Sequence, residues 1–362
     1  MMRSRAHVAS APDMGTLPSS STSGRTERWH RTRQGEVARA VAMGLGTERK
    51  QLPSWLLYDA IGSALFEQIT HLPEYYLTRA EAEILARRGD QIVAFAAGDG
   101  RRLSFAEIGA GTATKTEALL GAALRAQGSC VYLACDISEI PLRQAQQRLQ
   151  SQLPGAEVRV VVGTHTDAGP AIAALEDRQL LLWIGSSIGN YRDADAAQLL
   201  TQMRRFLRSD ALLVFGTDLV KDPQTLQRAY DDARGVTAAF SKNLLVRLNR
   251  EIDARFDIEA FRHVAEWNAE GSNIEVYLES TRVQRVWVGA LDRHYVFGLG
   301  ERIHTETCAK YDARRVDRIL DAAGFARAST QLDSEGRFAV HLARVASSDR
   351  GREPLTRRRE AC

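Results

Sequence analysis

A glycine-rich turn between a predicted strand and a predicted helix constrains the fold of this chain more than any other stretch. Residues 107–116 read EIGAGTATKT, after a short apolar segment at 101–106 and before a helical pattern at 117–124. Glycine lets the backbone turn sharply and approach a ligand closely, so Gly109 and Gly111 are typical of a loop that holds a phosphate or carboxylate group. The two glycines are equally typical of an ordinary tight turn between strand and helix.

An acidic residue at the end of the next predicted strand favours ligand binding at this loop. Residues 131–136 read VYLACD and end at Asp136, roughly twenty residues on, where a ribose-binding carboxylate is expected. A dinucleotide site would have a third glycine three positions after Gly111, where this chain has Thr114. Two glycines followed by Asp136 therefore predict S-adenosylmethionine as the ligand in preference to NAD.

Strand and helix patterns alternate through the middle of the chain. The expected strands are 103–108, 131–135, 157–162, 180–184 and 211–217, and the expected helices are 114–124, 139–150, 169–176 and 193–208. This alternation predicts an α/β fold, a parallel sheet with helices on both faces that binds ligands at the carboxyl ends of its strands. Asn190, in GSSIGN at 185–190, is expected at that edge, although Gly189 and Asn190 are equally typical of a turn that begins a helix.

Beyond residue 222 the alternation stops. Helices are expected at 223–233 and 236–253, and antiparallel strands at 261–267, 273–280, 283–288 and 301–309. Such an insertion is typical of a lid over a substrate. A helix at 313–323 that ends at Gly324, the usual residue after a helix C-terminus, and a strand at 337–345 are expected to return to the parallel sheet.

The N-terminal part of the chain changes character along its length. Residues 1–35 are rich in Ser, Thr, Arg and Gly, which predicts disorder. A helical segment is expected over 52–69, and a second helix over 80–86 with Thr78 as its cap. The loop between them contains two adjacent tyrosines, and since a buried tyrosine needs a partner for its hydroxyl, we expect one of them to face a ligand.

Composition argues against several classes of function. The net charge is only +3, and many arginines lie near the two ends of the chain, so nucleic acid is not an expected partner. The cysteines at 130, 135, 308 and 362 have no CxxC spacing, which predicts neither a metal site nor a disulfide framework and fits a reducing cytoplasm. No apolar run approaches the length of a membrane span, and no signal-peptide core is evident. We expect a cytoplasmic monomer.

Five segments together resemble one family. They are FEQITHLPEYYLTRAEAEIL (66–85), EIGAGTATKT (107–116), GSSIGNY (185–191), DLVKDPQTLQRAYDDARGVTAAF (218–240) and NLLVRLNRE (243–251). From about residue 55 to residue 342 the chain resembles the S-adenosylmethionine-dependent L-histidine Nα-methyltransferases of ergothioneine biosynthesis. The resemblance implies a Rossmann-like methyltransferase sheet with a discontinuous α+β accessory domain for the substrate.

The resemblance also implies a division of the chain. The expected parts are a disordered tail (1–35), the first piece of the accessory domain (36–84), the methyltransferase domain (85–220), the second accessory piece (221–309), a return to the methyltransferase domain (310–346) and a second disordered tail (347–362).

The same resemblance assigns roles to single residues. Gly109, Lys115 and Asp136 would contact the methyl donor, together with Gly111 of the glycine loop. The acceptor amino acid would be held by Tyr58 and Tyr75, with Asn190 and Tyr230 on its amino and carboxylate groups, which decides the open question about Asn190 in favour of function. Glu306 would bind the imidazole ring.

Three departures from the family pattern bear on specificity. Cys308 replaces a common serine and is a weaker hydrogen-bond partner, Val276 replaces a larger methionine, and Thr164 and His165 stand where the family often has Asp-Phe near the adenine. Histidine is the acceptor that the resemblance implies, and the first two departures, which make the pocket larger and less polar, make another aromatic amino acid such as tryptophan an alternative. In the simplest alternative, Glu306 is a solvated strand residue and Cys308 only packs in the core.

The implied reaction is transfer of methyl groups to a neutral amine that Tyr58 and Asn190 orient, ending in the trimethylated betaine hercynine. Positioning and desolvation would be the main tasks of such a site. Two other classes remain as alternatives: a nucleic-acid methyltransferase, and a protein that binds S-adenosylmethionine without catalysis.

Overall fold

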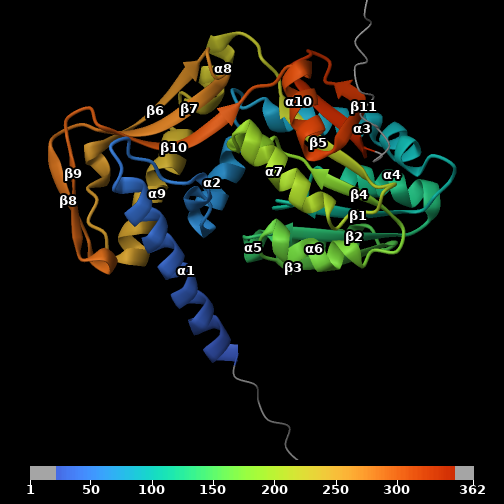
Figure 1. The fold of residues 1–362 in the computed structure, drawn as a ribbon, viewed down its shortest axis with the longest axis horizontal. Coiled ribbons are helices and arrows are strands. Elements are labelled where there is room, and N and C mark those ends of the chain that lie inside the picture. Colours follow the sequence, from blue (N-terminus) through green and yellow to red (C-terminus); the bar gives the residue numbers. More distant parts are fainter. Residues whose placement is uncertain (1–21, 347–362) are drawn as a thin grey trace, which may run out of the picture.

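The computed structural model of the chain describes residues 22–346, with side chains from residue 34 onward. Figure 1 shows two lobes, one built on a large sheet and one built around smaller sheets and the N-terminal helices. The expected tails at 1–21 and 347–362 lie outside the described residues. Residues 22–35 belong to helix α1 (Thr22–Leu45), which corrects the expected disorder there.

The larger sheet has the strand order β11-β12-β5-β4-β1-β2-β3. Its strands are β1 (Leu103–Ile108), β2 (Cys130–Asp136), β3 (Ala156–Val162), β4 (Arg178–Trp183), β5 (Leu212–Asp218), β11 (Phe325–Leu332) and β12 (Phe338–Val345). Strands β1 to β5 are parallel. The order places a topological switch point between β1 and β4, and the loops after these two strands therefore flank the usual ligand position of such a fold.

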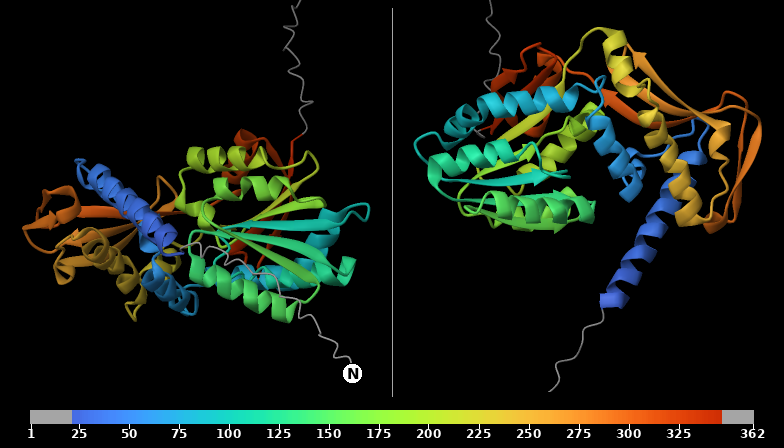
Figure 2. Two further views of the ribbon diagram at one scale, coloured as in Figure 1. Left: turned by 90° about the horizontal axis from the view of Figure 1, so that it is seen from below. Right: turned by 180° about the vertical axis from the view of Figure 1, so that it is seen from behind.

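Helices cover both faces of this sheet, as Figure 2 shows. They are α3 (Leu77–Ala97), α4 (Glu117–Gln127), α5 (Glu139–Gln152), α6 (His165–Ala173), α7 (Asp193–Arg204) and α10 (Ala313–Ala323). Alternate residues of β1 enter different cores: Phe105 packs in the cluster that contains α3, α4 and α5, and Ala106 in the cluster that contains α6, α7 and α10. Because both faces are covered, β1 is apolar along most of its length.

The last strands correct the expectation of a purely parallel sheet. Strand β12 does return to it, but antiparallel to β5, and β11 follows as an unpredicted antiparallel edge strand. Only Phe325 of β11 is fully buried. An edge strand with one solvated face lacks the continuous apolar run that identified the central strands.

The second lobe combines two small sheets with helices from the N-terminal segment and from the insertion. Its strands are β6 (Phe261–Asn268), β7 (Asn273–Ser280), β8 (Gln284–Val288), β9 (Arg293–Phe297) and β10 (Arg302–Ala309), of which β9 was not predicted. Its helical elements besides α1 are η1 (Ser54–Leu57), α2 (Ala60–Thr70), α8 (Pro223–Tyr230), α9 (Val236–Ile252), η3 (Ile258–Ala260) and η4 (Gly289–Leu291). The three-stranded sheet has the order β10-β7-β6, and β8 pairs with β9.

Helix α3 corrects one expected boundary. It begins at Leu77, with Tyr76 and not Thr78 at the N-cap, and runs without a break through the expected border between residues 84 and 85. It packs against α4 and β12, so the whole helix belongs with the large sheet. The other domain boundaries remain predictions.

Candidate active site

The glycine loop after β1 is fixed by Asp136. The Asp136 carboxylate accepts hydrogen bonds from the backbone N–H of Gly111 and of Ser138, each at 2.8 Å. Gly109 and Gly111 have φ of +69° and +52°, and a Cβ on either would meet no atom within 4 Å. Positive φ explains the need for glycine, and the free space beside it lets a ligand approach the backbone. The carboxylate oxygens retain lone pairs for further donors.

Lys115 lies at the same edge and is paired with a residue that the sequence did not single out. Its Nζ contacts the carboxylate of Glu81, a fully buried residue of α3. Glu81 also accepts from the N–H of Gly185 at 2.9 Å, directly after β4. A Cβ at Gly216 of β5 would come within 2.0 Å of the Glu81 carboxylate. Glu81 therefore holds Lys115 between the loops that follow β1 and β4.

Thr164 and His165 begin helix α6 beside Asp136. The N–H of Gly163 donates to the Asp136 carbonyl at 2.9 Å, which places this turn next to the carboxylate. Thr164 is exposed and forms a capping box with Asp167. The His165 ring instead contacts Gln202 of α7, with Nε2 3.1 Å from Oε1. A contact of either residue with adenine remains a prediction.

Three of the predicted acceptor residues lie on one face of the antiparallel sheet. Glu306 of β10 is directly opposite Val276 of β7, and Val276 is opposite Ala265 of β6. Opposed residues in such a sheet point to the same face, and so does Cys308 two positions along β10. This face therefore combines one carboxylate with small apolar side chains.

Asn190 reaches this face from the other lobe. It ends η2 (Ser187–Asn190), the turn after β4, and its Nδ2 donates to Glu306 Oε1 at 3.1 Å. Its Oδ1 is 4.0 Å from Cys308 Sγ. A Cβ at Gly189 would lie 3.2 Å from the Ala309 carbonyl, so glycine at this position lets η2 approach β10 closely.

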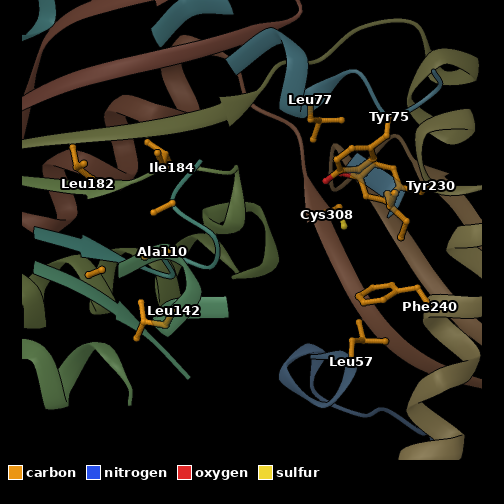
Figure 3. Close-up of a cluster of buried hydrophobic side chains, with 14 of the residues drawn as sticks. Leu57, Tyr75, Leu77, Ala110, Leu142, Leu182, Ile184, Tyr230, Phe240 and Cys308 are labelled. Carbon is orange, nitrogen blue, oxygen red and sulfur yellow. The ribbon is translucent and has the colours of Figure 1, made fainter. Parts of the chain in front are cut away.

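Aromatic rings form the wall beside Glu306. The Tyr58 ring has edge contacts with Phe66 and Phe240, at centroid distances of 5.6 and 5.5 Å. Tyr75 and Tyr230 contact each other at 6.1 Å, next to Cys308 (Figure 3). Phe66 and Phe240 were missed because nothing distinguishes them from ordinary core residues, although both lie in segments that carried the resemblance.

Tyr58 is positioned by its neighbour Asp59. The Asp59 carboxylate accepts from Gly62 N–H at 2.7 Å at the start of α2, from Asn243 Nδ2 at 2.8 Å and from Arg250 at 2.6 Å. Asn243 and Arg250 belong to α9. The α9 segment NLLVRLNRE thus holds Asp59 in place, and with it the adjacent residue Tyr58.

Carboxylates of both the predicted donor site and the predicted acceptor site act on Tyr58. Burial raises the pKa of Tyr58 well above its ordinary value, and the carboxylates of Glu306 and Asp136 both contribute. Glu306 belongs to the acceptor face, and Asp136 ends β2 and anchors the glycine loop, so the phenol lies within the field of both. Tyr58 therefore stays neutral and can donate or accept a hydrogen bond there.

A buried ionic network adjoins the aromatic wall, and the sequence did not predict it. Asp218 at the end of β5 accepts from Tyr76 OH at 2.8 Å and from Lys221 at 2.5 Å, and it forms an ion pair with Lys310 at 2.9 Å. Lys310 also donates to the Tyr230 hydroxyl at 2.9 Å. The only sequence signal was the expectation that one tyrosine of the adjacent pair faces a ligand. Tyr76 instead binds this network, and Tyr75 lies in the wall.

The predicted donor residues fit S-adenosylmethionine. Asp136 offers free lone pairs at the carboxyl end of β2, Lys115 offers a cation near the end of β4, and the glycine loop is open toward a ligand. Among the described residues, no group of three or more His, Cys, Asp or Glu could hold a metal ion. No helix within residues 22–346 is long and apolar enough to cross a bilayer.

Fold and site together define an S-adenosylmethionine-dependent methyltransferase. A sequence model of the histidine-specific, S-adenosylmethionine-dependent methyltransferases matches residues 37–345. The chain belongs to this family.

Curated relatives agree with this assignment. The histidine N-alpha-methyltransferase of Mycolicibacterium smegmatis is 41% identical over 310 residues, which cover 85% of this chain and 94% of that protein. The enzyme of the same name from Mycobacterium tuberculosis is 41% identical with the same coverage. Ergothioneine biosynthesis protein 1 of Neurospora crassa is 31% identical over 81% of this chain, which matches 33% of that longer protein.

Replacing Glu306 with glutamine should stabilise the unliganded protein above neutral pH. Burial raises the pKa of Glu306 from 4.5 to about 7, so between these two pH values the folded protein keeps a proton that the unfolded chain releases. The free energy of unfolding of the wild type therefore falls as the pH rises through this range, whereas that of the glutamine variant, which has no proton to lose at this position, does not. Its advantage in free energy of unfolding should grow from about pH 5 to about pH 8, to at most about 3 kcal/mol, measured by urea unfolding.

Glu279→Gln is the matched control on the adjacent strand. Hydrogen bonds from Arg302 and Arg262 lower the pKa of Glu279, so it is ionised in both states throughout this pH range. Its effect on stability should be constant between these pH values. A constant difference for Glu306→Gln as well would show that Glu306 ionises normally and faces solvent.

Proposed function

We propose that this protein methylates the α-amine of free L-histidine three times to give hercynine. The observation that carries the proposal is the pairing of Asn190 with Glu306, 3.1 Å apart, beside a wall of tyrosines. A carboxylate in that place can accept a hydrogen bond from an imidazole N–H, and the charge strengthens the bond. Neighbouring Val276 and Cys308 leave an otherwise weakly polar surface for the ring.

The side chains position the acceptor amine and exclude water from it. S-adenosylmethionine, when it is bound by the glycine loop, Lys115 and Asp136, would supply an electrophilic methyl group and would leave as S-adenosylhomocysteine. Tyr58 lies within the field of carboxylates of both sites, and its hydroxyl can orient the amine lone pair toward the donor side. Asn190 Oδ1, whose contact with Cys308 is weak, can accept one amine hydrogen. Orientation of this kind, together with desolvation, contributes several kcal/mol to catalysis in general.

The amine must lose its proton and then accept repeated methylation. Its proton can leave to water, because the buried tyrosines keep their own protons and can relay a proton but not retain a second one. Each added methyl group removes an N–H donor, so the contacts with Tyr58 and Asn190 weaken in turn. Tyr230 still binds the carboxylate and Glu306 still binds the imidazole after each transfer. These two contacts keep the mono- and dimethyl forms in position for the next methyl group.

We propose further that the protein is a cytoplasmic monomer with no nucleic-acid partner. Cys130, Cys135 and Cys308 are buried and free, which supports a reducing compartment. The division into a methyltransferase domain and a discontinuous accessory domain is part of the same proposal. It is supported by the contacts of Asp59 with α9, which join segments far apart in the chain.

The test is turnover of S-adenosylmethionine with free L-histidine. We expect a product that carries three methyl groups on one nitrogen, identified by mass spectrometry and by fragmentation at the α-amine. Methylation of bulk RNA, or binding of S-adenosylmethionine with no turnover of any amino acid, would contradict the proposal in favour of the two alternative classes.

Asn190→Ala and Tyr230→Phe should each raise the KM for histidine and leave the Kd for S-adenosylmethionine nearly unchanged. Each variant removes one hydrogen bond to a charged or reacting group of the acceptor, which corresponds to roughly 10- to 100-fold in KM. Steady-state kinetics and calorimetry with the donor measure the two constants. Tyr277→Phe is the control, because Tyr277 follows Val276 on β7 and points to the opposite face of the sheet. Wild-type efficiency in both test variants would remove these residues from the site.

A further inference from the structure

Lys310 is a buried cation that the proposed reaction does not use. It follows β10 directly, and its side chain is fully buried. Its Nζ donates to Tyr230 OH at 2.9 Å and lies 4.5 Å from the centre of the Tyr230 ring. On its other side it pairs with Asp218 at 2.9 Å. A lysine is seldom fully buried unless it is paired with an anion. Asp218 supplies that anion, so the hydrogen bond to Tyr230 needs a separate explanation.

The contact with Tyr230 determines the direction of the tyrosine proton. An ammonium group only donates hydrogen bonds, and a phenol carries one proton and accepts through its oxygen. Because Lys310 donates to the Tyr230 oxygen, the Tyr230 proton must point elsewhere. The Tyr230 ring lies next to Cys308, on the wall beside the acceptor face (Figure 3), and the cation of Lys310 lowers the pKa of that thiol against the larger effect of burial. The proton is therefore directed toward the acceptor face, where Cys308 lies.

The charges of the network favour an anion on that face. Asp218 is shared by two ammonium groups, those of Lys221 and Lys310, and also accepts from Tyr76. One carboxylate in direct contact with two cations leaves a local positive excess, which Asp333 offsets in part through its effect on Lys221. The field of Lys310 extends to the acceptor face, since it lowers the pKa of Glu306 against the larger effect of burial. A buried excess charge is costly until a counter-ion binds.

We propose that Lys310 is a positioning residue that turns the Tyr230 hydroxyl toward the acceptor's carboxylate and thereby restricts the enzyme to amino acids with a free α-carboxylate. This inference rests on the proposed function, in which the acceptor is a free amino acid held by Tyr230. It adds that the enzyme discriminates against acceptors that carry the same side chain but have an amide or a hydrogen in place of the carboxylate, because these lack the negative charge that would balance the two lysines on Asp218.

The test compares histidine with histamine, which has the same imidazole and amine but no carboxylate. In the wild type, kcat/KM should strongly favour histidine. In Lys310→Met this preference should fall by about 10- to 100-fold, mainly through the KM for histidine, with histamine turnover little changed. The double variant Lys310→Met/Tyr230→Phe should lose little more than either single variant, because the lysine acts through the tyrosine.

Lys221→Met is the matched control. Lys221 is the other cation on Asp218 and does not contact Tyr230; its remaining hydrogen bonds go to Tyr76 OH and the Leu219 carbonyl. Removing it should cost comparable stability and leave the preference for histidine over histamine at the wild-type value. A purely structural role of Lys310 would make the two variants behave alike.

The outcomes separate this inference from the function on which it rests. A wild type that does not methylate histidine overturns the proposed function. A wild type that does, with an unchanged histidine preference in a folded Lys310→Met protein, overturns the role of Lys310 alone. If Lys310→Met does not fold, Lys310→Gln decides, because it removes the charge and keeps a hydrogen-bond donor: a reduced histidine preference supports the inference, and an unchanged preference overturns it.

Discussion

Replacing Asp136 with alanine is expected to weaken S-adenosylmethionine binding by about 1.5–3 kcal/mol for each charged hydrogen bond that is lost. Two ribose hydroxyls are the expected donors, so the total loss should be the largest of any single substitution at the donor site. The structure adds a second reason. The same carboxylate holds the N–H groups of Gly111 and Ser138 at 2.8 Å, and without it the glycine loop loses its anchor. Isothermal titration calorimetry with the donor measures the effect.

Asp136→Asn and Asp177→Asn are the companion variants. The asparagine at 136 keeps one acceptor oxygen and the side-chain shape, so its loss should be smaller than that of alanine. Asp177 directly precedes β4, at the amino ends of the parallel strands and thus at the edge of the sheet opposite the ligand position. Its replacement should leave the donor affinity close to wild type. An unchanged affinity in Asp136→Ala would rule out the donor site described here.

The second large effect is expected in the choice of amino acid. In a competition among free amino acids the wild type should prefer histidine, accept tryptophan second and use phenylalanine poorly. An imidazole or indole N–H can donate to the Glu306 carboxylate, whereas a phenyl ring would leave it with the hydrogen bond from Asn190 and no donor from the acceptor, at a cost of about 1–3 kcal/mol or more. In Glu306→Ala this penalty disappears, so histidine activity should fall and phenylalanine activity should rise.

Val276→Met is the companion substitution on the same face. Val276 is buried directly opposite Glu306, so a longer side chain there fills space that an indole would need while leaving the carboxylate in place. It should reduce tryptophan turnover more than histidine turnover. An order of preference that is the same in the wild type, Glu306→Ala and Val276→Met would mean that the side chain of the acceptor binds elsewhere.

The sequence by itself determined the strands that are buried on both faces. Strands β1, β2, β4 and β5 read as apolar runs because a parallel sheet covered by helices offers them no solvated side, whereas the edge strand β3 exposes Glu157 and Arg159. The two glycines and Asp136 were readable for a local reason, since a loop with positive φ needs glycine and the acid ends a strand at a known edge. The family was evident from ordered motifs along the chain, and the match over residues 37–345 confirms it.

Only the tertiary structure decided which charged residues are buried. Glu81 has the local sequence of an ordinary helix surface, and its partners Lys115 and Gly185 lie 34 and 104 residues away. Lys310 likewise meets Tyr230 across 80 residues. The edge strand β11 was also decided by its neighbours, because its own side chains are mostly solvated. The cost of burying a charge is offset by its partner, and a partner brought close by folding leaves no local signal in the sequence.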